Sequence, residues 1–167
     1  MLRIRSALRR CRTLLTCGRA RQGLVIESVV ALARARLLLR AVPFQQLSTR
    51  WGALVPIGDP CIAAHAIGVG SAADAETARE IGWAVTATAT VMPFTAMCLQ
   101  QAVAAREMLA RRGIAAVIHY GAGRDAAGQL VAHAWLDAAG ARVTGYPVAP
   151  NIAAIGAFVP QPMRADR

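Results

Sequence analysis

The chain has 167 residues, of which 56% are hydrophobic and 17% charged. This is the composition of a folded domain with an apolar core, and it excludes a disordered chain. The length is that of one domain. The net charge is +10, and all of it lies in residues 1–50, which hold 11 arginines and one acid, Glu27; residues 51–167 hold eight arginines and eight acids.

The concentrated positive charge fits three kinds of partner: nucleic acid, an anionic membrane surface, or an acidic protein or peptide. Single-stranded nucleic acid is bound by aromatic side chains interleaved with basic ones. No aromatic residue precedes Phe44, so we expect no nucleic-acid partner. The charge favours docking of an acidic partner, and contact with a membrane surface stays open.

Targeting and redox signals indicate a cytoplasmic protein. Residues 1–22 are rich in arginine, as in an organelle transit peptide, but they lack the apolar core of a secretory signal. The cysteines at 11, 17, 61 and 98 form no Cys-x-x-Cys pair, so neither a zinc site nor a thioredoxin motif is expected. We therefore expect reduced thiols, no metal and no cofactor. The uncharged stretch from Ile81 to Ala105 is broken at Pro93, which favours two buried helices over a membrane span.

Hydrophobic periodicity predicts two helices in the first half of the chain. The first runs from Leu24 to Val42, with one apolar face and one arginine-rich face. A less regular stretch and a weak helix over residues 60–73 follow. Asp74 is the expected N-cap of the second helix, which runs to about Val91.

The second half predicts one more helix and then strands. With Thr95 as a candidate N-cap, the helix runs from Cys98 to Arg111. The period then changes to two, with a glycine-rich turn over residues 121–128 and a tight turn over 137–140. The expected strands are Ile114–Tyr120, Leu130–Leu136, a short one at 142–144, and Ile152–Val159. This order predicts an α+β fold, with a helical N-terminal region (1–73) and a core (74–167) in one compact unit.

Two residues of the core have the chemistry of a cysteine hydrolase. Cys98 begins a predicted helix, where a thiolate is stabilised by the helix dipole and by free N–H groups. The N–H of Cys98 itself also suits an oxyanion. His133 lies in a predicted strand and shares a face with Trp135, an aromatic wall suited to orienting an imidazole. Cys98 is therefore the candidate nucleophile and His133 the candidate acid and base.

The remaining chemically active side chains are expected to be structural. Cys61 and His65 have helical spacing, and His119 lies in the neighbouring strand. A lone cysteine or histidine in an apolar segment is usually a core residue. The pair of Cys98 and His133 is therefore singled out by its position at a helix start and in a later strand.

A family resemblance supports this pair. From Ala78 to Phe158 the chain resembles the leader peptidases of lasso peptide biosynthesis, the transglutaminase-like protease half of a split maturation system, and the helix Glu27…Ala35-Arg36…Pro43-Phe44 resembles the family's N-terminal region. The motifs that carry the resemblance are Trp83-Ala84-Val85…Met92-Pro93-Phe94, Cys98-Leu99-Gln100-Gln101-Ala102, Leu109-x-Arg111-Arg112-Gly113-Ile114, Tyr120-Gly121 and Ala132-His133-Ala134-Trp135-Leu136.

The resemblance implies a transglutaminase- or papain-like core, with the cysteine helix packed on an antiparallel sheet. It implies a Cys-His-Asp triad that removes the leader peptide from a ribosomally made precursor. The implied partners are that leader peptide, a small leader-recognition protein, and an ATP-dependent lasso cyclase.

The chain departs from the family at the aspartate, expected about a dozen residues after the histidine. Thr144-Gly145 stands there. Asp137 lies about 13 Å from His133 along the strand, at about 3.3 Å per residue. This distance favours Asn151, Asp125, a backbone carbonyl or a water over Asp137 as the orienting group, and all five stay open.

Two other functions stay open beside the protease. An acyl transferase of the same fold uses an amine in place of water as acceptor. A non-catalytic scaffold docks a leader peptide or a partner protein on the arginine-rich helices.

Overall fold

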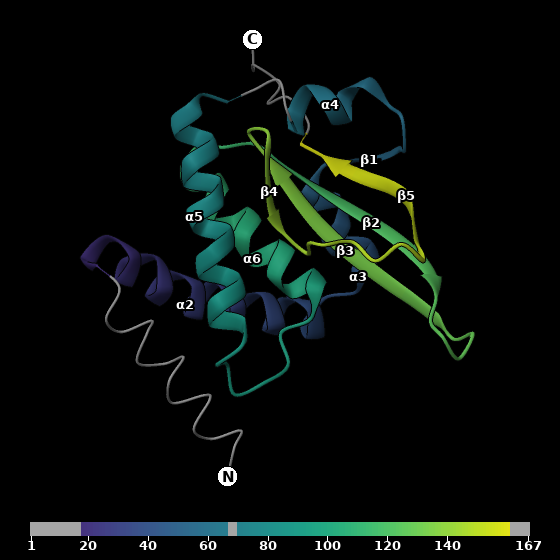
Figure 1. Ribbon diagram of the computed structural model, residues 1–167, viewed down its shortest axis with the longest axis horizontal. Coiled ribbons are helices and arrows are strands. Elements are labelled where there is room, and N and C mark those ends of the chain that lie inside the picture. The colour runs from purple at the N-terminus through teal and green to yellow at the C-terminus, as the bar shows by residue number, and fades with distance from the viewer. Residues whose placement is uncertain (1–17, 67–69, 161–167) are drawn as a thin grey trace.

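The computed structural model describes residues 18–66 and 70–160, and its helices and strands form a layered α+β unit (Figure 1). The helices are α2 (Arg19–Ala41), α3 (Phe44–Ser48), α4 (Pro60–Ala66), α5 (Ala72–Ala89) and α6 (Cys98–Ala110). The strands are β1 (Ala53–Pro56), β2 (Ala116–Arg124), β3 (Leu130–Ala138), β4 (Ala141–Thr144) and β5 (Ile152–Val159). They form one antiparallel sheet in the order β1-β5-β2-β3-β4.

The two faces of the sheet pack against different helices. On one face, Ile118, Leu136 and Phe158 join the main core together with Met108 and other residues of α2, α5 and α6. On the other face, the strand residues that alternate with these, such as Val117, pack with α4 in a smaller cluster. Because successive side chains of a strand point to opposite faces, Leu136 lies on the α6 side of β3 and His133 on the α4 side.

The N-caps of α5 and α6 differ from the expected ones. Ser71, and not Asp74, is the N-cap of α5. Its Oγ accepts the N–H of Asp74 at 3.1 Å, while Asp74 Oδ2 accepts the N–H of Ser71 at 2.8 Å. Asp74 is thus the third residue of a capping box, where an acid serves as well as at the cap. The N-cap of α6 is Met97 instead of Thr95, and Gln100 Oε1 accepts its N–H at 2.9 Å.

The sheet includes one strand that the sequence pattern did not predict. Four-residue β1 pairs with β5 at the sheet edge, so residues 53–56 share a sheet with the core region 74–167. Strand β2 also runs further than expected, to Arg124, so the glycine-rich turn is shorter. A Cβ on Gly121 would lie 2.5 Å from the carbonyl oxygen of Ala153 in β5, and this close approach explains glycine inside a strand.

Helix α2 covers α5 and α6 and is joined to them by ion pairs. Glu27 lies 2.7 Å from Arg112 and 3.2 Å from Arg111, at the end of α6. Arg34 pairs with Glu107 at 3.3 Å, and Arg21 with Glu80 of α5 at 3.7 Å. Two arginines of the N-terminal region, Arg21 and Arg34, are therefore paired with acids of the same chain.

The uncharged stretch from Ile81 to Ala105 forms the end of α5, a loop through Pro93, and the start of α6. Across the described ranges, none of the helices combines the length and apolarity needed to cross a membrane.

Candidate active site

Cys98 is the first residue of α6. The first hydrogen bond of the helix runs from the N–H of Gln101 to the carbonyl oxygen of Met97, at 3.1 Å. The N–H groups of Cys98 and Leu99 precede it, so the helix supplies no acceptor for either. The thiol, which is partly exposed, thus lies where the helix stabilises a negative charge, on sulfur or on a bound oxygen.

His133 is held by a backbone carbonyl. Its Nε2 lies 2.7 Å from the carbonyl oxygen of Gly145, twelve residues further along the chain. A carbonyl oxygen only accepts, so Nε2 carries the proton and Nδ1 of the neutral ring is free to act as base. The ring also stacks on Trp135, with centroids 6.0 Å apart and an interplanar angle of 21°. The expected aromatic wall is therefore present.

Cys98 and His133 line two hollows together. The polar hollow, of about 280 Å³, lies between the start of α6 and the segment after β4, and its other lining residues are Thr86, Gln101 and residues 143–147. The apolar hollow, of about 270 Å³, is lined besides by Phe44, Leu54, Leu99, Ile118, Tyr120, Gly121, Ala132, Ala134 and Phe158.

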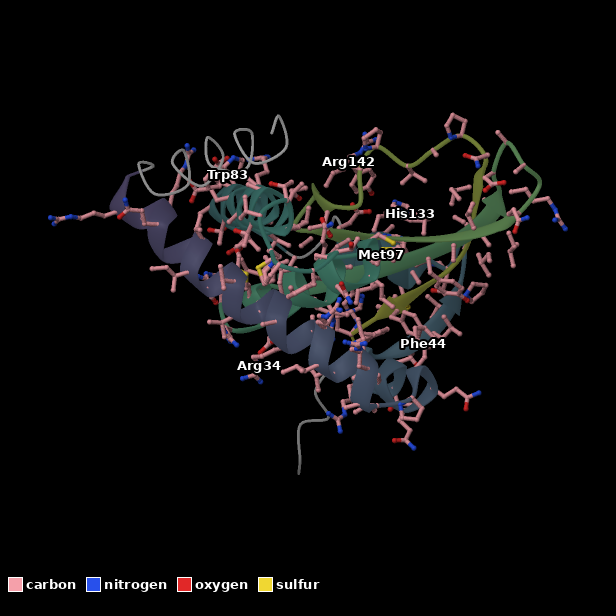
Figure 2. The ribbon with its side chains drawn as sticks, turned by 90° about the horizontal axis from the view of Figure 1, so that it is seen from below. Arg34, Phe44, Trp83, Met97, His133 and Arg142 are labelled. Atoms are coloured by element: carbon pink, nitrogen blue, oxygen red, sulfur yellow. The ribbon has the colours of Figure 1, made fainter. Side chains whose placement is uncertain are left out.

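The two residues approach this shared space from different directions. Figure 2 shows Met97, the residue before Cys98, and His133 near each other at the sheet. We expected the sheet to present the histidine directly to the helix, but strand alternation places the ring on the face away from α6. Strand β4 pairs with β3 only as far as Leu136 and Thr144, so the edge of β3 is open beside His133. In the described part of the chain, the ring's hydrogen bond goes to Gly145 and not to the thiol. Cys98 and His133 thus border one hollow at an open sheet edge, and in substrate-free sites the contacts between catalytic groups are commonly long.

None of the three polar side chains considered as orienting group contacts His133. Asp137 Oδ1 accepts a hydrogen bond from the hydroxyl group of Tyr146, with the two oxygens 2.6 Å apart. Asp125 accepts backbone N–H groups within its own turn. Asn151 Nδ2 donates to the carbonyl oxygen of Arg124 at 2.7 Å. The carbonyl of Gly145 fills the place instead.

The conformation of Gly145 excludes an acid at this position. Its φ is +81°, which strains any residue with a side chain. A Cβ would also lie 2.8 Å from Cα of Trp135. The chain therefore presents a main-chain oxygen at the position where the resemblance implied a carboxylate.

Asp137 contacts two residues, Tyr146 and His119, that lie next to the partners of the His133 ring. It accepts a hydrogen bond from Tyr146, the residue after Gly145, and burial together with this bond raises the pKa of the Tyr146 hydroxyl. Its Oδ2 also lies 3.0 Å from Nε2 of buried His119, at ion-pair distance although not at hydrogen-bond geometry. The His119 ring stacks on Trp135, with centroids 5.4 Å apart. In the sequence, the one trace of this network is the period-two spacing of His133, Trp135 and Asp137, which puts them on one face of a strand.

The second cysteine–histidine pair lies on α4 outside the core, and Cys61 is exposed. Nδ1 of His65 contacts the carbonyl oxygen of Cys61 at 3.0 Å, on the exposed helix α4. Asp59 hydrogen-bonds to the Cys61 thiol and raises its pKa. This thiol is thus a poor nucleophile and a useful reference for Cys98.

Comparison with known proteins identifies a family. The family model of the transglutaminase-like superfamily matches residues 46–154, which is more than half of the chain and includes Cys98, His133 and Gly145. No curated protein and no solved structure matches the chain.

Proposed function

This chain belongs to the transglutaminase-like superfamily, a family of cysteine peptidases and transglutaminases, and we propose that it is a cysteine protease that removes the leader peptide from a ribosomally made lasso precursor. Cys98 begins a helix, the carbonyl of Gly145 holds His133, and both residues line the same two hollows. This arrangement is the observation that supports the proposal.

In the proposed reaction, Nδ1 of His133 takes the proton of the Cys98 thiol and the thiolate attacks the scissile carbonyl carbon. The N–H of Cys98 stabilises the oxyanion that forms. The imidazolium then gives its proton to the leaving amine, and the C–N bond breaks. Water, deprotonated by His133, releases the acyl group and restores the thiol.

The carbonyl of Gly145 performs part of the work of a triad aspartate. It fixes the tautomer and the direction of the ring, because only the protonated Nε2 is able to donate to it. It lacks the negative charge that stabilises an imidazolium. Loss of the tautomer-fixing acid in a serine protease costs about 10⁴ in rate, and a carbonyl retains the tautomer without the charge.

The substrate and partners follow from the resemblance and from the surface. Two hollows beside one thiol leave room for a peptide on both sides of the bond that is cleaved. The arginine-rich N-terminal region suits an acidic leader or the small protein that delivers it. An ATP-dependent cyclase then consumes the new N-terminus of the core peptide, in the cytoplasm.

The proposal is tested on the precursor encoded beside the gene, together with its recognition protein. The wild type is expected to release leader and core with the mass of one added water. Cys98→Ala and His133→Ala are expected to release neither, while Cys61→Ala matches the wild type. Leader removal by Cys98→Ala would reject the assignment.

An acyl transferase is the second candidate, favoured by the polar hollow, which offers space for an amine acceptor. The same mass spectra identify it, because transfer adds the mass of the amine instead of water. Salt-sensitive binding of the leader without any Cys98-dependent product would indicate the non-catalytic scaffold.

A further inference from the structure

We propose that the apolar hollow is a specificity pocket that accepts one large aliphatic or aromatic side chain from the substrate residue bound next to Cys98. This inference rests on the proposed function, because it takes Cys98 as the residue that reacts. It assigns a substrate class to a surface that the superfamily membership leaves undefined.

The size of the hollow fits one side chain. Its volume is about 270 Å³. An apolar protein cavity of about 150 Å³ is large enough to bind benzene. The hollow therefore admits a phenylalanine- or leucine-sized group, and it is too small for a folded segment of a partner.

Two alanines create this space. Ala132 and Ala134 flank His133 on β3 and point to the opposite face from its ring, the face on which Ile118 and Phe158 lie. Larger side chains at these positions would fill the hollow. The same short segment thus presents the imidazole on one face and opens the pocket on the other.

The rim of the hollow is apolar and, within the described part of the chain, exposed. Phe44 and Leu54 are 50% and 57% exposed, although the Phe44 ring packs edge-on against Phe158. Figure 2 shows Phe44 on the side of the sheet that carries α2, away from Arg142. Exposed apolar side chains around a concavity gain free energy when a ligand covers them.

The lining also excludes charged occupants. The titratable residues of its lining are Cys98, Tyr120 and His133, and among the described residues that line it there is no carboxylate and no arginine. A charged side chain entering the hollow would lose its hydration without gaining a partner. The occupant is therefore a neutral, apolar group.

The test measures how fast Cys98 is alkylated by three iodoacetamides: the parent reagent, its N-benzyl derivative and its N-carboxymethyl derivative. Mass spectrometry of peptides gives the rate at Cys98 and, in the same molecule, at exposed Cys61. Each Cys98 rate is divided by the Cys61 rate, which removes the intrinsic reactivity of the reagent. The N-benzyl reagent is expected to favour Cys98 by at least about tenfold over the parent, and the N-carboxymethyl reagent to disfavour it.

Ala132→Phe is expected to abolish the preference for the benzyl group, because its ring fills the hollow. Ala132 is exposed, so the larger side chain is compatible with folding. Ala154→Phe is the matched control, an exposed strand alanine on β5 outside the hollow, and is expected to keep the preference.

Equal normalised rates for the three reagents in the wild type, or a benzyl preference that survives in Ala132→Phe, would overturn the pocket. This failure is distinct from failure of the proposed function. A Cys98 that outpaces Cys61 with the parent reagent but shows no benzyl preference keeps the nucleophile and rejects the pocket. A benzyl preference at a Cys98 that does not cleave the precursor keeps the pocket and rejects the protease.

Discussion

Gly145 orients the proposed catalytic histidine through its main chain, so a substitution there acts on both stability and activity. Gly145→Ala is expected to destabilise the fold by at least about 2 kcal/mol, since a left-handed residue with a Cβ is strained and this Cβ meets Trp135. It is also expected to lower kcat about 100-fold, because a displaced carbonyl misplaces the imidazole. Chemical denaturation and precursor cleavage measure the two effects.

Gly128→Ala is the matched control for this variant. Gly128 has a φ of +76°, close to that of Gly145, but nothing lies within 4 Å of its added Cβ. It is expected to cost about 1–2 kcal/mol and to leave kcat unchanged. Equal kcat values for the two alanine variants would contradict the role of the Gly145 carbonyl.

Tyr146 gives a pH-dependent prediction. Burial and the hydrogen bond to Asp137 raise its pKa in the folded protein, while the unfolded chain loses this proton near pH 10. Above about pH 10 the folded state therefore holds more protons than the unfolded state, and stability falls as the pH rises. Tyr146→Phe is expected to reduce this alkaline loss of stability, as followed by thermal unfolding from pH 8 to pH 11. A loss of the same size in the variant would show that Tyr146 does not cause it.

Glu27 joins α2 to the end of α6. Hydrogen bonds from Arg112 and Arg111 lower its pKa, so its contribution is present above its ordinary pKa, about 4.3, and is lost as the pH falls. Glu27→Gln is expected to cost about 1 kcal/mol at pH 7. This difference from the wild type should close below about pH 4 in urea unfolding curves.

Glu76→Gln is the control, since Glu76 and Arg79 form an exposed pair within α5. Its expected effect is within about 0.5 kcal/mol at either pH. A difference for Glu27→Gln that persists undiminished at low pH would mean that its charge is not what stabilises the contact.

The elements with strong local signals were predictable from the sequence. Helix α6 has its boundaries set by a helix start at Cys98 and by Gly113 after its end, and β3 and β5 follow period two. Strand β1 was missed because it has four residues and ends in Pro56, and edge strands tolerate proline. Its place is decided by pairing with β5, more than 90 residues away in sequence, which no local pattern encodes.

For the candidate site, too, only the features with a local sequence signal were predictable. The types and local positions of Cys98 and His133 follow from their own elements. The carbonyl acceptor was one of several open alternatives, because every residue has a carbonyl and only tertiary structure selects one. The apolar hollow combines residues from six separate elements of the chain, so its existence depends on packing and not on a motif.

The uneven distribution of charge along the chain predicts salt-dependent binding of an acidic partner. Arg21 and Arg34 are paired with acids of α5 and α6, whereas Arg40 and Arg50 are exposed. Leader binding is expected to weaken as salt rises past about 0.15 M, where the screening length is about 8 Å. Arg40→Gln combined with Arg50→Gln should weaken binding at low salt and flatten the salt dependence. An affinity that does not change with ionic strength would count against an acidic partner.

Alkylation of Cys98 by iodoacetamide tests whether Cys98 and His133 act as a pair. The rate at Cys98 is measured at pH 7 in the wild type and in His133→Ala. Cys61 in the same molecule serves as reference, and its unchanged rate reports an intact fold. Cys98 is expected to react faster than Cys61 in the wild type and to fall to the Cys61 rate without the imidazole. A Cys98 rate equal to that of Cys61, or one unaffected by His133→Ala, would contradict this expectation.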